Sequence, residues 1–394
     1  MIRKIIFIES AGEMGGVEFS TLYLASHLDT NSWQPIVVCP SEGKLSSACR
    51  EAALDVVIIP IHPLAPTSFR VGIADTRIPN PLAWFWNIFF IWDATGWLWK
   101  FLARTKPDLV ITKGLYAHFF GGLAARLAQV KCIWHVQDFI SERFWGLYRA
   151  FFGLAASVLP DEIVVDGTPI ANQLPKKIQS RVHVVLNGVD VTVFRPSTDS
   201  ATVRHQLRLN PEDLVIGHAA RITPWKGQHH LLEAFKKVAA RHPQVHLLLV
   251  GAPIFDNDIY EQRLRRRIEE MGMFNRVTFA GFRVDLPQVL QAMDIFAYPS
   301  VEKDTSPLAL LSALACGLPV VAFDIDGVKE VLGETGLLVP VRDENKMSEA
   351  LEKLIEDTSL RKRMGVLSRK KALQEFSLEQ YVKSMEKVFL QVNI

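Results

Sequence analysis

The 394-residue chain lacks the features expected of a secreted protein or of one that binds nucleic acid. Its four cysteines are scattered, and no pair has the spacing of a zinc site or of a disulfide framework. The formal net charge of +2 leaves no basic excess for nucleic acid. The apolar part of the N-terminus is too short for a signal peptide. A reducing cytoplasm is therefore the expected compartment.

A long uninterrupted hydrophobic run is also lacking. The segment from Trp84 to Leu102 is strongly aromatic, but Asn87, Asp93 and Lys100 interrupt it. A helix that crosses a membrane needs about 20 predominantly apolar residues, so a crossing is not expected here. Two interpretations stay open: a helix buried against a sheet, or an interfacial helix whose tryptophans lie among lipid headgroups. In the second case residues 84–99, up to Trp99, form a peripheral membrane contact.

The sequence does contain short β-branched runs that alternate with helical patterns. These runs are continuously apolar, which is typical of strands covered on both faces in a parallel sheet. Each half of the chain is therefore predicted to be a doubly wound α/β domain, and the length favours two such domains. The predicted strands are 4–8, 36–39, 56–59, 109–112, 132–136, 163–165 and 182–185, followed by 215–219, 245–250, 277–280, 295–298 and 319–323.

A boundary between the two domains is predicted near residue 190. Asn187-Gly188-Val189-Asp190 has turn chemistry, and Pro196 follows as a helix breaker. The predicted domains are residues 1–190 and 191–376.

Open α/β sheets bind ligands at the carboxyl ends of their strands, so the loops that follow the strands are the candidate sites. The loop after the first strand contains Gly12, Gly15 and Gly16 and leads into a helix. Glycines let backbone amides approach an anion, and the helix start adds a favourable dipole. A tight turn without a ligand explains this loop equally well, because the spacing of a dinucleotide fingerprint is missing.

Two loops of the second half carry stronger signals. Arg221 and Lys226 lie five residues apart after a strand, and such a pair can hold the two phosphates of a nucleotide diphosphate. The loop 298–307 leads into an apolar helix, where the backbone amides of Thr305, Ser306 and Leu308 are expected to be free for an anion. Pro307 cannot donate and suits the first helical turn.

Taken together and in this order, the loops resemble glycosyltransferase family 4, the large retaining family with the GT-B fold. That fold consists of two Rossmann-like doubly wound domains that face each other across a cleft. The similarity covers nearly the whole chain, and its motifs are specific only jointly. The five matches are Gly15-Gly16-Val17-Glu18, Asn187-Gly188-Val189-Asp190, the Arg221 and Lys226 pair with Gly227, residues 299–321, and Asp326-Gly327-Val328-Lys329-Glu330 before residues 335–340.

The resemblance implies a nucleotide-sugar donor such as a UDP-sugar, held mainly by the second domain, with no metal and no cofactor. The acceptor, a glycan or a lipid-linked molecule in polysaccharide or glycoconjugate synthesis, would enter from the first domain, at the inner face of the cytoplasmic membrane. A final helix, 377–394, is expected to pack back on the first domain. The implied donor contacts are Gly15, Gly16, Arg221, Lys226, Phe282, Arg283, Asp304, Thr305, Ser306, Leu308 and Ser312.

The chain departs from the family pattern at two positions. The family has two glutamates separated by seven residues, and the matching residues here are Asp304 and Ser312. Asp304 keeps a carboxylate, whereas Ser312 loses the charge that would contact the ribose. Glu302 is an alternative to Asp304, although it is out of register by two residues.

The family histidine of the first domain matches Trp134-His135-Val136-Gln137, where either His135 or Gln137 can occupy the place. We predict His135, neutral near its ordinary pKa and bonded to a sugar hydroxyl or to a backbone carbonyl, beside a buried structural role as the alternative. His118, His229 and His230 are assigned to packing or surface, without a carboxylate partner. The implied catalytic residues are Asp304, His135, Arg221 and Lys226.

Two other functions stay open. A sugar-nucleotide epimerase can share this two-domain architecture, although the Arg221 and Lys226 loop speaks against it. A catalytically weak relative that only binds a sugar nucleotide or a partner is the non-enzyme alternative, motivated by Ser312.

Overall fold

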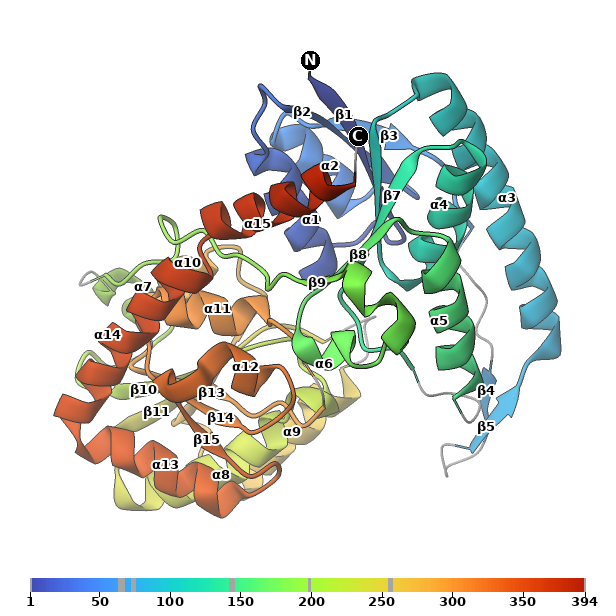
Figure 1. Cartoon of the computed structure of the whole chain (residues 1–394). Helices are drawn as coiled ribbons and strands as arrows, with labels where there is room; N and C mark the ends of the chain where they lie inside the picture. Colours follow the sequence, from blue (N-terminus) through green and yellow to red (C-terminus); the bar gives the residue numbers. More distant parts are fainter. Residues whose placement is uncertain are drawn as a thin grey trace. The chain divides into compact units, whose positions relative to one another are not determined.

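The computed structural model describes residues 2–62, 68–71, 76–141, 146–197, 200–253, 258–302 and 304–392, without the side chains of 68–71, 76–79, 81 and 84. The chain divides into two compact units, drawn in Figure 1: Met1–Val185 with Tyr381–Ile394, and Leu186–Gln380. The division lies before the predicted turn because that turn is bound to the second unit. Val189 donates its amide to the carbonyl of Phe376 (2.8 Å) and accepts from Leu378 (2.9 Å).

The first unit is built on a seven-stranded parallel sheet in the order β3-β2-β1-β6-β7-β8-β9. Its apolar strands are covered on both faces, as their continuous hydrophobicity predicts. The strands are β1 (Arg3–Glu9), β2 (Trp33–Cys39), β3 (Asp55–Ile58), β6 (Leu109–Lys113), β7 (Lys131–Val136), β8 (Glu162–Val165) and β9 (Val182–Val184). A separate antiparallel pair, β4 (Ser68–Val71) and β5 (Thr76–Pro79), was not predicted.

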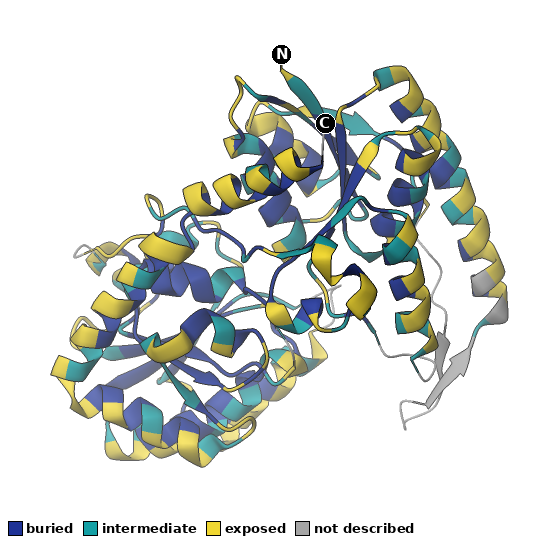
Figure 2. Cartoon of the chain, viewed as in Figure 1, coloured by how far each residue is buried: buried dark blue, intermediate teal, exposed yellow. Residues whose placement is uncertain are grey.

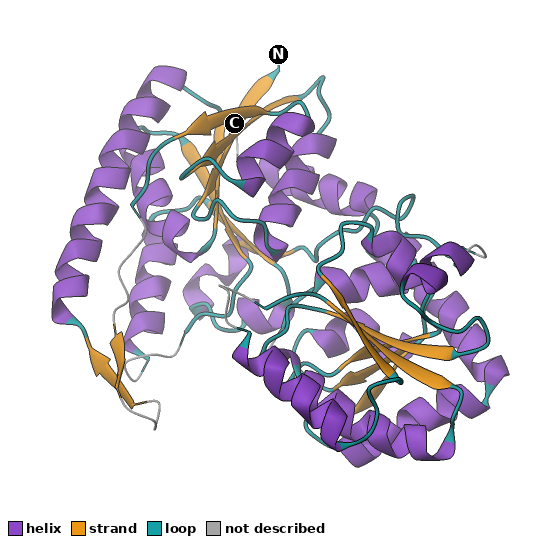
Figure 3. Cartoon of the chain, turned by 180° about the vertical axis from the view of Figure 1, so that it is seen from behind, coloured by secondary structure: helices purple, strands orange, loops and turns teal. Residues whose placement is uncertain are grey.

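Helices cover both faces of this sheet. Figures 1 and 3 show α3, α4 and α5 on one side and α1 and α2 on the other. The helices are α1 (Gly16–His27), α2 (Lys44–Glu51), α3 (Pro81–Thr105), α4 (Leu115–Leu127), α5 (Leu147–Val158), the short α6 (Thr168–Ala171) and α15 (Leu378–Gln391). The last of these packs on the first unit, where the rings of Phe389 and Trp33 meet edge to face at 5.4 Å.

The second unit has a six-stranded parallel sheet in the order β12-β11-β10-β13-β14-β15. Its strands are β10 (Leu214–Ala219), β11 (Val245–Val250), β12 (Val277–Gly281), β13 (Ile295–Tyr298), β14 (Val320–Phe323) and β15 (Gly336–Val339). Its helices are α7 (Ala201–Gln206), α8 (Gln228–Arg241), α9 (Ile259–Glu270), α10 (Leu286–Gln291), α11 (Leu308–Ala315), α12 (Val328–Leu332), α13 (Glu344–Glu356) and α14 (Thr358–Glu375). Only β15 lacks a counterpart among the predicted strands of this half.

Each unit encloses its own hydrophobic core between sheet and helices, visible in Figure 2 as buried strands under helices that are exposed on their outer sides. The prediction of two doubly wound α/β domains is confirmed. Within the described ranges, none of the helices combines the length and the hydropathy that crossing a membrane requires.

Candidate active site

In the second unit, the loops after the neighbouring strands β10 and β13 lie against each other at the carboxyl edge of the sheet. This is the point where the strand order reverses, the usual ligand position in such sheets. The loops touch at Gly227, which has a φ of +72° and whose added Cβ would lie 1.8 Å from the carbonyl oxygen of Pro299. Val301 also donates its amide to the carbonyl of Trp225 (2.9 Å). Only glycine permits this approach, which brings residues 221–227 and 299–307 together.

Lys226, Tyr298 and Asp304 form a polar cluster between these loops. The ammonium of Lys226 donates to the carboxylate of Asp304 and lies 3.3 Å from the Tyr298 hydroxyl. Tyr298 donates to the same carboxylate at 2.5 Å. Burial, followed by the charge of Asp304, holds the pKa of Tyr298 well above its usual range, so the phenol stays a donor. Two of the predicted residues, Lys226 and Asp304, are therefore directly bonded to each other.

Arg221 lies at the start of the same loop, and its side chain is exposed. Its backbone is fixed by Gln228, whose side-chain amide donates to the Arg221 carbonyl at 2.8 Å. In the part of the chain that the structure describes, the Arg221 guanidinium carries neither a hydrogen bond nor an ion pair. This cation is consequently available to an external anion.

The loop before α11 presents its backbone to the same edge. Gly327 has a φ of +88°, and its added Cβ would lie 2.1 Å from the carbonyl oxygen of Asp304, so these backbones are in close contact. Ser306 has a φ of +45° and is held by Asn187, which donates its side-chain amide to the Ser306 carbonyl at 3.1 Å. No described residue accepts from the backbone amides of Ser306 and Leu308. Free amides at a helix start attract anions.

In the first unit, four neighbouring strands end in a buried polar network. Glu9 and Lys113 are the last residues of β1 and β6 and are paired in register, and both are fully buried. Lys113 donates to the Ser20 hydroxyl at 2.5 Å, while Thr21 donates to Glu9. Burial raises the pKa of Glu9 and lowers that of Lys113, so it favours the neutral form of both groups.

His135, at the end of β7, belongs to this network. Its Nε2 lies 2.8 Å from Asp166 Oδ1, and Gln137 donates to the other Asp166 oxygen at 2.8 Å. Burial, followed by the charge of Lys113, lowers the pKa of His135, so the ring is neutral at pH 7 and its Nε2 proton points to the carboxylate. Nδ1 is buried and has no partner among the described residues. The expectation of an ordinary pKa is wrong, whereas the neutral ring agrees with the prediction. The partner of Nε2 is Asp166, and a contact of His135 with a sugar hydroxyl stays a prediction.

Comparison with known families decides the identity of the fold. The model of Glycosyltransferase Family 4 matches residues 14–193, and that of Glycosyl transferases group 1 matches residues 199–371. The chain belongs to glycosyltransferase family 4. The resemblance found in the sequence is thereby confirmed.

Solved structures give this family 4 protein the GT-B fold. The Anabaena protein Alr3699/HepE, in complex with UDP and glucose, has a TM-score of 0.82 and 23% identity over 98% of this chain and 99% of that one. A glycosyltransferase from Rickettsia africae has a TM-score of 0.81 and 17% identity over 100% and 99% of the two chains. At these identities the likeness establishes the fold.

Curated relatives match about half of the family 4 chain. A D-inositol 3-phosphate glycosyltransferase of Stackebrandtia nassauensis is 34% identical over 47% of this chain and 43% of its own length. A GDP-mannose-dependent monoacylated alpha-(1-6)-phosphatidylinositol monomannoside mannosyltransferase of Corynebacterium glutamicum is 35% identical over 49% and 52%. The match thus spans about half the length of each relative.

The other predicted donor residues of the family 4 protein differ in how far they are buried. Ser312 is buried on α11, and Glu302 is exposed. Phe282 is exposed after β12, and the neighbouring Arg283 is paired with Asp285 at 2.6 Å. Thr305 is buried in the loop before α11. Their contacts with a donor stay predictions.

The glycine loop of the first unit leads into the N-terminus of α1, where the Glu18 carboxylate lies close to the Gly15 backbone. Backbone hydrogen bonds at Gly15 and Glu18 oppose the rise that burial causes in the pKa of Glu18. A Cβ added to Gly15 would lie 2.9 Å from the Glu18 carboxylate, whereas one added to Gly16 would meet nothing within 4 Å. An anion at this helix start would therefore compete with Glu18.

Three further histidines were assigned to packing or surface without a carboxylate partner. His118 fits this, since it is buried, stacks on Trp134 at 5.0 Å and bonds Thr112. His229 bonds the Tyr260 hydroxyl at 2.7 Å. His230 lies 2.6 Å from a carboxylate oxygen of Glu344, so the assignment without a carboxylate is wrong for this residue.

Sequence reasoning missed Tyr298, Glu9, Lys113, Asp166 and the buried His218, whose Nδ1 lies 2.9 Å from the Ala297 carbonyl. All of them lie within one residue of the carboxyl end of a strand, so the rule that located Arg221 could have drawn attention to them.

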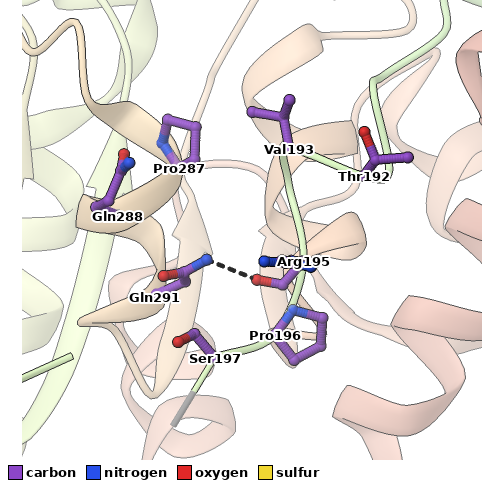
Figure 4. Close-up of a pocket in the computed structure, with 8 residues that line it drawn as sticks. All are labelled: Thr192, Val193, Arg195, Pro196, Ser197, Pro287, Gln288 and Gln291. Atoms are coloured by element: carbon purple, nitrogen blue, oxygen red, sulfur yellow. Dashed lines mark hydrogen bonds between the residues drawn. The ribbon is translucent and has the colours of Figure 1, made fainter. Parts of the chain in front are cut away.

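Two open cavities of the second unit lie outside this cluster. One of about 700 Å³, shown in Figure 4, lies between the 192–197 segment and α10, where Gln291 donates to the Arg195 carbonyl at 2.9 Å. The other, of about 490 Å³, is lined by residues before and on α9, including Asp258, Glu261 and Arg265. Neither is lined by a predicted site residue. Among the described residues, no group of three or more His, Cys, Asp or Glu could hold a metal ion.

Proposed function

We propose that this protein is a retaining glycosyltransferase that moves a sugar from a nucleotide diphosphate sugar to a glycan or lipid-linked acceptor. The observation that carries the proposal is the position of Arg221, exposed and without a side-chain partner among the described residues, in the same loop as Lys226 at the switch point of the second sheet. The backbone amides of Ser306 and Leu308, after the neighbouring strand, also have no acceptor among those residues. Cations and helix-start amides together form a site for a diphosphate.

These groups also account for a chemical step. Departure of the nucleotide diphosphate builds negative charge, and Arg221, Lys226 and the amides before α11 stabilise that charge more strongly as the sugar bond breaks. Asp304 and Tyr298 hold the Lys226 ammonium in place for this task. We therefore propose a reaction in which the cationic side chains, in place of a metal ion, stabilise the charge of the leaving diphosphate.

The proposed donor is a UDP-sugar. Support comes from the Anabaena protein, which is similar over nearly the whole chain and is described in complex with UDP and glucose. The mannosyltransferase of Corynebacterium glutamicum uses GDP-mannose according to its name, so GDP-mannose is the competing donor.

The acceptor is proposed to be reached in the cytoplasm, at the inner face of the membrane. Support comes from α3, on which Trp86, Trp92, Trp97 and Trp99 are exposed. The first alternative from the sequence, a helix buried against a sheet, does not hold for these four side chains, although Ala94, Leu98 and Leu102 are buried. The side chain of Trp84 lies outside the described residues.

Calorimetry and turnover test the proposal together. The purified protein should bind UDP or GDP, and it should transfer or hydrolyse the sugar of one donor from a panel, equally well with and without a chelator. Arg221→Ala should weaken nucleotide binding by about tenfold or more, since a charge-assisted contact to phosphate is lost. Arg363→Ala, an exposed arginine on α14, is the matched control and should bind as the native protein does. Absence of any turnover over the whole panel would contradict the enzyme claim.

A catalytically weak relative is the second candidate, and Ser312 favours it. Replacement by a longer carboxylate tests the position, because Ser312→Glu would restore the group that the family places on the ribose. Tighter UDP binding by Ser312→Glu, without turnover in the native chain, would support a binding protein.

A further inference from the structure

Three adjacent helices of the first unit form one outer layer. α4 lies between the other two: Thr95 of α3 contacts the Phe120 carbonyl of α4 at 3.5 Å, and Phe119 of α4 stacks on Phe151 of α5 at 5.4 Å. Figures 1 and 3 show the three helices on the same side of the sheet. Their outer surfaces therefore form one continuous face of the unit.

The outer side of α3 is apolar along most of its length. Its inner side packs on the unit through small and aliphatic residues such as Ala94, Leu98 and Leu102. Of the side chains that the structure describes on this helix, eight large apolar ones are exposed by between 42% and 71%: Leu82, Phe85, Trp86, Ile88, Phe89, Trp92, Trp97 and Trp99. Soluble monomers rarely expose so many contiguous apolar side chains, and such patches mark interaction surfaces.

The apolar face continues onto α5. Leu147, Phe151, Leu154 and Val158 are between 54% and 67% exposed, while Phe152 between them is buried in the core. Their spacing of four, three and four residues places them in one stripe along the helix. On α4, between these two helices, Tyr116 and Leu127 are 45% and 52% exposed. Among the residues that the structure describes, apolar side chains on all three helices are thus exposed.

The charges on these helices are almost all positive. The sequences of α3, α4 and α5 contain one acid, Asp93, and four bases, Lys100, Arg104, Arg126 and Arg149. Lys100 lies 5.6 Å from the ring of Trp97, so a cation and an aromatic side chain share one place on the face. Tryptophan beside lysine and arginine is the composition of membrane interfaces, where rings lie among headgroups and cations meet anionic lipids.

We propose that the outer face of α3, α4 and α5 docks on a lipid bilayer that carries anionic headgroups. The apolar side chains enter the headgroup and acyl boundary, and Lys100 and Arg104 contact the anionic lipids. A second copy of the chain is disfavoured as the occupant, because a two-fold contact would oppose two surfaces of the same positive sign. The inference extends the membrane contact proposed above from one helix to three, and it does not depend on the donor site.

Vesicle flotation with the full chain tests this inference. The native protein should float with vesicles of phosphatidylcholine and phosphatidylglycerol and bind weakly to phosphatidylcholine alone. The triple variant Trp86→Ser, Phe89→Ser, Trp92→Ser should lose at least about tenfold in partitioning, because apolar insertion is removed. Lys100→Glu with Arg104→Glu should remove the preference for anionic vesicles and its salt dependence.

Matched measurements separate docking from folding and from the donor site. Phe274→Ser removes a side chain that is 67% exposed in the second unit, and it should float as the native protein does. Nucleotide binding by calorimetry should be equal in all variants, so failure of the proposed function and failure of docking give different results. The inference is overturned if the native protein does not float, or if the triple variant floats unchanged. It is also overturned if the native protein forms a dimer in solution and the triple variant is a monomer.

Discussion

At the scale of single residues, the effect of Asp304 on ligand binding depends on Lys226. The ammonium is bonded to the Asp304 carboxylate and is at the same time the proposed partner of a diphosphate. A carboxylate next to a phosphate site repels the ligand unless a cation stays between them. Asp304 therefore helps binding only while Lys226 is present.

A double-mutant cycle measures this coupling. Lys226→Ala should weaken UDP or GDP binding more than Arg221→Ala does, because it both removes a cation and exposes the Asp304 carboxylate. Asp304→Ala alone should have a smaller effect, and the double variant should bind better than the sum of the single losses predicts, by about 1 kcal/mol. Additive losses would show that the two residues act separately.

Asp166 acts on His135 as a positioning residue. Its carboxylate lies 2.8 Å from Nε2, which keeps the ring proton on that nitrogen and leaves Nδ1 as an acceptor. In Asp166→Asn the side-chain amide can donate to Nε2 instead, and the proton moves to Nδ1. Nitrogen-15 chemical shifts of the ring report the tautomer directly, and a shift pattern identical to that of the native protein would contradict this role. If Asp166 had only a structural role, Asp166→Asn would lower the free energy of unfolding, but the His135 ring proton would stay on Nε2.

At the scale of elements, the contact of two loops depends on one glycine. Any side chain at Gly227 would overlap the Pro299 carbonyl, and the φ of +72° is itself unfavourable for other residues. Gly227→Ala is expected to cost about 2 kcal/mol or more of unfolding free energy and to displace Lys226 from Asp304. Urea unfolding and nucleotide calorimetry check the two effects.

Unlike Gly227, Gly96 is a glycine that neither its φ nor the surrounding space requires. It lies inside α3 with φ in the ordinary range, and an added Cβ would meet nothing within 4 Å. Gly96→Ala should therefore stabilise the protein by about 0.5 to 1 kcal/mol. A loss of stability here would mean that glycine substitution destabilises this protein for reasons other than φ and space.

The sequence predicted the strands whose burial is nearly complete, and also the partly buried β3, β9 and β12. β10, β11 and β13 are covered on both faces, so their runs are apolar without interruption and their bounds agree within a residue with those predicted. β15 is short and follows a turn, and its Leu-Leu-Val run was attributed to a motif. The turn 187–190 was placed in the first domain because its pairing with residues 376–378 is not visible locally.

Those site residues that lie together on one loop could be predicted from the sequence. Arg221 and Lys226 follow one strand, so a local pattern finds them. The pairing of Lys226 with Asp304 spans 78 residues, and that of Glu9 with Lys113 spans 104. These pairs depend on strand order and register, which are set by the packing of whole sheets.

At the scale of the whole molecule, buried histidines couple stability to pH. Burial lowers the pKa of His118 to about 3 and that of His218 to about 4, from an ordinary 6.5. Each ring is neutral in the folded state but gains a proton in the unfolded state below pH 6.5. The stability that each ring contributes is therefore complete above pH 6.5 and is lost as pH falls from 6.5 toward its folded pKa.

His118 belongs to the first unit and His218 to the second, so variants separate the contributions. By linkage, each histidine should cost about 2 kcal/mol of unfolding free energy between pH 7 and pH 5. His118→Gln loses the contact with Trp134 and is less stable at every pH, but its loss between pH 7 and pH 5 should be smaller than the native loss by that amount. Glu9 has the opposite effect, because its raised pKa adds stability as pH falls toward 4.5. Subtracting the pH dependence of the unfolding free energy of His118→Gln from that of the native protein removes this contribution, which both share.

His205→Gln, at an exposed position on α7, is the control and should have the same pH dependence as the native protein. An unchanged pH dependence in His118→Gln would show that the His118 ring takes up a proton without unfolding.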